Sequence, residues 1–232
     1  MKIFSLSNYR YPIAIAAVAT SLSHTTKVNT KPLIQPIDTE DVFVKQIPPQ
    51  NPVEKYTTED LPGAFREEVN PSGWTNNNEV LKNAPTPKFQ LMGEEKLASA
   101  VVDITNCILY YYNTQGKPVC AFPVATGASS TPTSQGIKRV VAKLVYPYST
   151  SPARSKRRRH PNDYGPKILY LYKVNPETGE ETDDGGYIHG TRHENAIEKG
   201  HITHGCVRLH NRDALYFIND LMQKDMYIVF KK

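Results

Sequence analysis

The sequence predicts a mainly β fold, a β-sandwich or barrel-like domain with one or two short helices, for residues 97–232. Three observations carry this prediction. Short runs of β-branched and aromatic residues alternate with turn residues throughout this region, as in strands joined by tight turns. Only one stretch has the spacing of an amphipathic helix. Half of the chain's 18 prolines lie earlier, in residues 24–96, so the two parts of the chain differ in composition.

Strands and one helix account for most of this domain. Strands are expected at residues 100–104, 107–112, 119–124, 136–145, 168–174, 186–189 and 227–230. Residues 113–116, Asn-Thr-Gln-Gly, suit a turn between the second and third strands. Asn211 is suited to be the N-cap of the helix, with Asp213 near its positive end. The apolar face of this helix comprises Leu215, Ile218 and Met222.

Residues 1–23 have the pattern of a secretory signal peptide. Lys2 and Arg10 precede an apolar run at residues 12–22, and small residues follow near Ser23. As a helix this run would be about 17 Å long, too short for a hydrocarbon core of about 30 Å. We therefore expect cleavage near Ser23 and export to the periplasm or cell wall, with a permanent membrane anchor as the alternative.

Residues 24–96 are expected to form an extended, largely disordered linker. Prolines interrupt every helical or alternating pattern in this segment. Trp74, the only tryptophan of the chain, allows two interpretations. It docks on the domain and covers its groove, or it is an isolated exposed aromatic residue.

Charge and cysteine content restrict the partners and the redox chemistry. A net charge of +5 suits an anionic neighbourhood such as a cell wall, and no nucleic-acid-binding motif is present. Three cysteines leave at least one thiol unpaired within the chain, and we expect Cys206 to be free. Cys107 and Cys120 flank the predicted hairpin turn, so either a disulfide or two buried thiols is possible there.

The residues with the clearest chemistry lie between positions 185 and 208. Cys206 follows Gly205 directly, which suits a tight turn that exposes a thiol. Only the thiolate is a strong nucleophile, and a free cysteine with a pKa of about 8.5 is mostly protonated at neutral pH. A neighbouring base is needed. His204 is poorly placed for an in-line hydrogen bond to the sulfur, so we expect His189, arriving from an adjacent strand, to be that base.

Two separated sequence blocks resemble the L,D-transpeptidase (YkuD-type) catalytic domain family. They are His-Gly-Thr at residues 189–191 and Thr-His-Gly-Cys-Val-Arg-Leu at residues 203–209, followed by Asn-Arg-Asp-Ala-Leu-Tyr at residues 211–216. The resemblance covers roughly residues 98–232. The sequence departs from the family at residues 131–136, Thr-Pro-Thr-Ser-Gln-Gly, where a second proline is usual in place of Ser134.

The resemblance implies a mainly β fold and a thiol site without metal or cofactor. Cys206 would be the nucleophile and His189 the proton acceptor and donor, with a backbone carbonyl near Gly190 or Thr191 orienting the imidazole. The backbone N–H groups of His204, Gly205 and Cys206 are the expected oxyanion donors. The residues expected to bind substrate are Tyr187, Gly190, Thr191 and Arg208. Arg208 either holds a substrate carboxylate or anchors the loop.

The substrate implied by the resemblance is a peptidoglycan stem peptide, and the product a 3→3 cross-link. Water as acceptor would give an L,D-carboxypeptidase, and a wall-anchored protein is a third acceptor. A non-catalytic wall-binding module is the alternative of another class. We expect a monomer that binds no nucleic acid and associates with a membrane only through an uncleaved signal segment.

A zinc site is the competing interpretation of the histidine-rich region. The residues concerned are His189, His193, His201, His204, Cys206 and His210. Their spacing follows no common zinc pattern, and His193, His201 and His210 have no assigned role. Two charged segments remain. The basic run at residues 154–160 is either a flap rim that attracts anionic substrate or a solvated loop. Residues 177–184 are expected to form a solvated acidic hairpin end.

Overall fold

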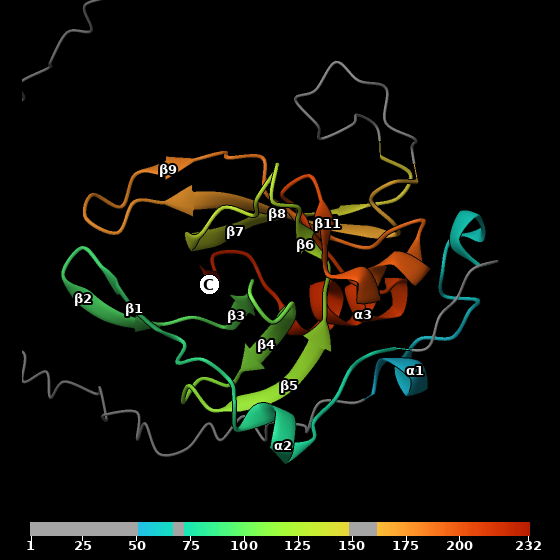
Figure 1. Ribbon diagram of the computed structural model, residues 1–232, viewed down its shortest axis with the longest axis horizontal. Helices are drawn as coiled ribbons and strands as arrows, with labels where there is room; N and C mark the ends of the chain where they lie inside the picture. Colours follow the sequence, from blue (N-terminus) through green and yellow to red (C-terminus); the bar gives the residue numbers. More distant parts are fainter. Residues whose placement is uncertain (1–50, 67–71, 149–161) are drawn as a thin grey trace, which may run out of the picture. The chain divides into compact units, whose positions relative to one another are not determined.

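The computed structural model describes residues 51–66, 72–148 and 162–232 (Figure 1). The chain divides into a unit at residues 1–46 and a unit at residues 47–232, and every described residue belongs to the second. The expected signal peptide, residues 24–50 of the expected linker and the basic run at residues 154–160 lie outside the described residues. No described helix is both long and apolar enough to cross a membrane.

One nine-stranded sheet dominates the unit at residues 47–232, which confirms the mainly β prediction. Its order is β12-β10-β8-β7-β13-β3-β4-β5, with β9 beside β8, and it curls so that β7 and β8 lie across from β3 to β5 (Figure 1). The strands are β3 (Ala100–Asp103), β4 (Ile108–Tyr112), β5 (Pro118–Pro123), β7 (Gly136–Val145), β8 (Lys167–Val174), β9 (Glu181–Thr182), β10 (Ile188–His189), β12 (Val207–Arg208) and β13 (Tyr227–Lys231).

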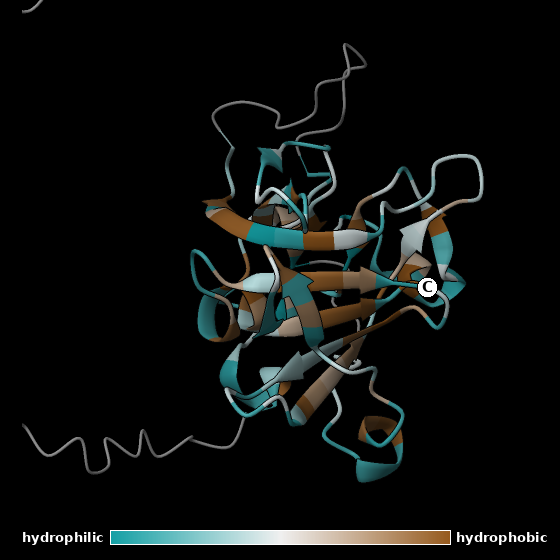
Figure 2. Cartoon of the chain, turned by 90° about the vertical axis from the view of Figure 1, so that its left-hand side faces the viewer, coloured by the Kyte–Doolittle hydropathy of each residue, from teal (hydrophilic) through white to brown (hydrophobic). Residues whose placement is uncertain are grey.

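Two smaller sheets flank the large one. Strands β1 (Lys88–Leu91) and β2 (Glu94–Leu97) form a hairpin, and β6 (Thr126–Gly127) pairs in parallel with β11 (His201–Thr203). The apolar colour in Figure 2 is concentrated on the strands, whereas most loops are polar. The main core consists of side chains from both halves of the curled sheet and from the C-terminal helix, including Leu109, Phe122, Leu171, Phe217, Ile218 and Phe230. Burying each of these stabilises the fold by about 1.5–3 kcal/mol.

The predicted C-terminal helix is present, but its start differs from the prediction. Helix α3 (Asn211–Tyr216) continues into a π-helical turn, η3 (Phe217–Leu221). The N-cap is His210, without a side-chain cap, rather than Asn211. The Asn211 backbone N–H instead donates to Glu194 Oε1 at 2.7 Å. A carboxylate from another segment therefore satisfies this helix-end donor.

Part of the expected linker is ordered, which corrects the expectation of disorder for residues 51–66 and 72–96. These residues contain α1 (Pro52–Lys55), η1 (Gly63–Phe65), α2 (Asn78–Leu81) and β1, and most of β2. Tyr56 Oη donates to Asp220 Oδ2 at 2.7 Å, and Leu61 and Phe65 pack on Leu215 of α3. Pro52 is compatible with α1 because proline is tolerated in the first turn of a helix.

Trp74 docks on the domain, so the interpretation as an isolated exposed residue is wrong. Its side chain packs against the main core. The next residue, Thr75, forms a backbone bridge to Ala121 of β5, with N–O distances of 2.9 and 2.8 Å. Residues 72–75 therefore cover the outer edge of β5, which would otherwise present unpaired backbone groups.

None of the three cysteines forms a disulfide, so the disulfide alternative is wrong. The β4–β5 register pairs Tyr111 with Cys120 and Ile108 with Pro123. Cys107, which precedes Ile108, therefore lies beyond Pro123, four residues or about 13 Å along the strand from Cys120. Cys120 is fully buried, and burial raises the pKa of its thiol to about 12.

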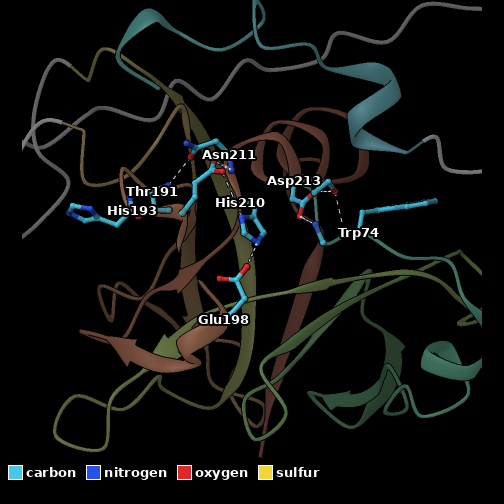
Figure 3. Close-up of polar contacts among 10 residues, drawn as sticks. Trp74, Thr191, His193, Glu198, His210, Asn211 and Asp213 are labelled. Carbon is cyan, nitrogen blue, oxygen red and sulfur yellow. Dashed lines mark hydrogen bonds and ion pairs between the residues drawn. The ribbon is translucent and has the colours of Figure 1, made fainter. Parts of the chain in front are cut away.

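Asp213 connects α3 to the segment that covers β5. Its carboxylate accepts hydrogen bonds from the Ser72 hydroxyl and from the Gly73 backbone N–H, the latter at 3.2 Å (Figure 3). The side chain is fully buried, and desolvation raises its pKa to about 6. Hydrogen bonds from Ser72 and Gly73 counteract part of this effect because they favour the charged form.

Asp213→Asn is expected to change the pH dependence of stability. The pKa of Asp213 is about 6 in the folded state and about 3.9 in an unfolded chain. The wild type therefore loses stability through this group as pH rises from about 4 to about 6. The free energy of unfolding of the variant, relative to wild type, should rise by about 3 kcal/mol across this window. Urea unfolding at a series of pH values measures the difference.

Glu177→Gln, at an exposed turn, is the matched control for loss of a carboxylate. Plots of unfolding free energy against pH that run parallel for Asp213→Asn and wild type from pH 4 to pH 7 would contradict the raised pKa of Asp213.

Candidate active site

The two sequence blocks meet because β10 and β12 pair in parallel. His189 ends β10, and Cys206 immediately precedes β12. The Val207 N–H donates to Tyr187 O at 2.8 Å, and the Leu209 N–H donates to His189 O at 2.9 Å. The histidine and the turn that carries the cysteine therefore lie on neighbouring strands, at the end of the sheet formed by β12.

The orientation of the His189 ring is fixed by its own loop. Nδ1 lies 2.5 Å from Gly190 O, within the region where an orienting carbonyl is expected. Because a carbonyl only accepts hydrogen bonds, Nδ1 carries the hydrogen and Nε2 is the basic nitrogen. The Tyr164 ring packs edge-on against the imidazole, with 4.8 Å between centroids. With only 2% of its surface exposed, His189 has a buried imidazole whose orientation is fixed.

Cys206 is a mostly buried cysteine that forms no disulfide. It is 9% exposed and packs with Tyr164, Ile168 and Tyr187. Its Sγ lies 3.8 Å from Gly185 O. The thiol therefore lies between the loop before β10 and an apolar cluster that includes Tyr164, whose ring contacts His189.

A threonine builds the turn that carries the thiol. Gly205 has φ +109°, which a residue with a side chain rarely adopts. The Gly205 N–H donates to Thr203 Oγ1 at 3.2 Å, and the same hydroxyl donates to Cys206 O at 2.6 Å. The Gly205 N–H, one of the expected oxyanion donors, thus bonds to a side chain of its own turn in this conformation.

Thr203 was not among the site residues expected from the sequence, although a local pattern could have identified it. A threonine two residues before a turn glycine often hydrogen-bonds to the backbone. The Thr203 carbonyl in turn accepts the Thr131 hydroxyl and the Ala128 N–H, both at 2.9 Å. The loop in which the sequence departs from the family pattern therefore bonds to the turn that carries Cys206.

The other expected site residues are distributed between the interior and the surface. Tyr187 is buried and stacks on Tyr170, with 4.6 Å between centroids. Gly190 packs so closely on Asn211 that a Cβ would collide with its side chain. Arg208 is half-buried and His204 is exposed. The structure thus brings Cys206 and His189 together, with Tyr187 beside the thiol, while it leaves the His204 side chain at the surface.

A buried polar network supports the segment after His189 (Figure 3). The Thr191 N–H donates to Asn211 Oδ1 at 2.8 Å, and Glu194 Oε1 accepts the Asn211 N–H. His210 lies 3.8 Å from Glu194 and 3.4 Å from Glu198. Burial alone would lower the pKa of His210, but the nearby carboxylates outweigh it and raise the pKa. No local sequence signal identifies Glu194 as a member of this network.

The zinc interpretation has no support in the described part of the chain, where no group of three or more His, Cys, Asp or Glu side chains is arranged to hold a metal. His201 Nδ1 lies 2.7 Å from Thr126 Oγ1, and His193 is exposed. The histidines that crowd the sequence are therefore dispersed in space.

Three solved structures of L,D-transpeptidases are similar to the chain at low identity. One from Mycobacterium smegmatis has 16% identity and a TM-score of 0.40, with 64% of this chain and 69% of that chain covered. One from Mycobacterium tuberculosis H37Rv has 18% identity and a TM-score of 0.37, with coverage of 57% of each chain. One from Xylanimonas cellulosilytica has 16% identity and a TM-score of 0.39, with coverage of 64% of each chain. No curated protein sequence matches the chain.

The family assignment comes from a sequence match that includes both blocks. A family model described as the L,D-transpeptidase catalytic domain, YkuD, matches residues 98–229. This range is more than half of the 232 residues. It contains His189, Cys206 and the buried polar network that follows His189. The chain therefore belongs to the L,D-transpeptidase catalytic domain family.

Proposed function

We propose that this protein is a peptidoglycan L,D-transpeptidase that forms 3→3 cross-links between stem peptides through a thioester on Cys206. One observation carries the proposal. The pairing of β10 with β12 places an oriented imidazole beside the turn that carries a thiol outside any disulfide. A base and a thiol on adjacent strands, with the base held by a third group, is the arrangement that cysteine acyl transfer requires. Membership of the family supplies the substrate class.

The first half of the reaction forms the thioester. His189 Nε2 takes the proton of the Cys206 thiol, and the thiolate attacks the carbonyl on the L-centre of the third stem residue. Backbone N–H groups of the turn, that of His204 among them, stabilise the oxyanion of the tetrahedral intermediate. The bond to the terminal D-alanine then breaks, and protonated His189 returns the proton to the leaving amine.

The second half transfers the acyl group. The amine of a neighbouring stem attacks the thioester carbonyl and gives a proton to His189. The C–S bond breaks, and the thiolate takes up a proton again. The result is an amide between two third-position residues, and no metal or cofactor takes part. Arg208, half-buried two residues after the thiol, is suited to bind a substrate carboxylate as a two-pronged donor.

The location of the substrate supports an exported protein. Peptidoglycan lies outside the cytoplasm, which agrees with a signal peptide at residues 1–23 and with action in the periplasm or cell wall. We propose a monomer that associates with a membrane only where the signal segment stays uncleaved. Water as acceptor would make the enzyme an L,D-carboxypeptidase, and a protein acceptor would make it an attachment enzyme.

Reaction with disaccharide tetrapeptides is expected to give cross-linked dimer and free D-alanine. Cys206→Ala should give neither, because the thioester cannot form. Mass spectrometry of the products measures the outcome, and Cys120→Ala, which alters a buried thiol outside the site, is the matched control. Tripeptide without dimer would identify a carboxypeptidase. Full turnover by Cys206→Ala would defeat the mechanism.

Thr203→Val is expected to slow acylation about 100-fold, because the hydroxyl that shapes the turn is lost while the side-chain volume is kept. Single-turnover acylation by the tetrapeptide measures the rate. Thr203→Ser should restore most of it because the hydroxyl returns. The control is Thr182→Val on an exposed part of β9. An equal rate for Thr203→Val and wild type would show that the turn does not depend on this hydroxyl.

A further inference from the structure

A fully buried lysine lies outside the mechanism described so far. Lys138 of β7 has 0% of its surface exposed. Its Nζ donates to Asp184 Oδ2 at 2.6 Å and to Ser134 Oγ at 2.7 Å, and lies 4.9 Å from the centre of the Phe230 ring. Burial of an ammonium group is costly, and these three contacts are what offsets it. The position of this cation is therefore well defined.

Lys138 holds the loop that leads into β10. Asp184, its ion-pair partner, accepts the Gly186 N–H at 3.0 Å through its other oxygen. A Cβ at Gly186 would come within 2.6 Å of Lys138 Nζ, so the ammonium lies directly against the loop backbone. Asp183 accepts the Gly185 N–H at 2.9 Å and the Tyr170 hydroxyl at 2.7 Å. The acidic segment expected to be solvated is thus bonded to the sheet at this end.

The same loop contacts the reacting sulfur. Gly185 O lies 3.8 Å from Cys206 Sγ, and Gly185 itself has φ +74°. The chain then runs through Tyr187 to His189 within four residues. A displacement of this loop would move the carbonyl that faces the sulfur and the strand that carries the base.

The charge of Lys138 also acts on Cys206. Desolvation lowers the pKa of Lys138, and the charges of Asp184 and Cys206 raise it. The ammonium of Lys138 and the sulfur of Cys206 therefore interact electrostatically. Lys138 has no exposed surface, but the Asp184 side chain is 17% exposed. Solvent therefore screens the charge of the carboxylate more than the charge of the ammonium. The other ionisable groups around the thiol and this ion pair are Tyr164, Tyr187, His189, Tyr170, Asp183 and Lys173.

We propose that Lys138 is a positioning residue for the reaction of Cys206. With Asp184 it holds residues 183–186 against the sulfur, and its buried positive charge favours the thiolate over the thiol. The inference rests on the proposed function only in taking Cys206 as the nucleophile.

Lys138→Met keeps the length of the side chain and removes the charge. The expected result is an alkylation profile of Cys206 whose midpoint lies about one pH unit higher than in wild type. Single-turnover acylation at neutral pH should fall about 10- to 100-fold. Iodoacetamide labelling across a pH series, followed by peptide mass mapping, reads Cys206 without any substrate. Cys107, half-buried in another part of the structure, is the internal reference in the same digest.

Two further variants keep the test decisive. Lys143→Met removes a lysine from the same strand, where Nζ donates to Asn219 O rather than to the site, and should leave the Cys206 midpoint unchanged. The double variant Lys138→Met/Asp184→Asn leaves neither partner of the ion pair buried and unpaired, so it is expected to fold even if Lys138→Met does not. Its midpoint should be raised as well.

A midpoint that coincides with wild type in the folded variant, or that lies below it, overturns the inference about Lys138. This result is distinct from failure of the proposed function, which Cys206→Ala tests by turnover. A raised Cys206 midpoint in the variant, together with transpeptidase products from wild type, supports both the inference about Lys138 and the proposed function. A raised midpoint in the variant, without any turnover by wild type, supports the inference about Lys138 alone.

Discussion

The parallel pairing of β10 with β12 is the constraint on which the site depends. Each strand contributes only two residues, and β12 lies at the end of the sheet order. So short a pair is held by few backbone hydrogen bonds, and small changes in the loops on either side would alter the approach of the imidazole to the thiol. The position of the imidazole relative to the thiol must therefore be fixed by the chain around the two strands.

Side chains that form hydrogen bonds to backbone groups hold these surrounding segments in place. Thr203 holds the turn before β12, Asn211 holds the segment after β10, and Asp184 holds the loop before β10. The first two are fully buried, and a buried polar group that lost its partner would cost about 1–3 kcal/mol. The geometry is therefore fixed by groups that cannot easily exchange their partners for water.

The features that could be predicted from the sequence are those that depend on local residue patterns or on the chemistry of single side chains. Long strands such as β7 and β8 follow from residue type and turns, and the Cys206–His189 pair follows from the need of a thiol for a base. The role of Asn211 could not be predicted as well, because its side chain bonds to Thr191, twenty residues away, instead of capping its own helix. Lys138 lies in a strand pattern where nothing marks it as buried, since its partner Asp184 is distant in sequence.

The ordered part of the expected linker belongs physically to the site, although the family match begins at residue 98. A row of edge-on aromatic contacts runs from Phe65 through Tyr146, Tyr148 and Tyr164 to His189, with centroid distances of 5.0, 5.9, 6.3 and 4.8 Å. Each such pair contributes about 0.5–1.5 kcal/mol beyond the area it buries. The His189 imidazole is therefore packed at the end of a row that starts outside the region of family similarity. The prolines of this segment indicated that it could not form long elements. Helical turns of three or four residues with a few apolar anchors need neither length nor periodicity.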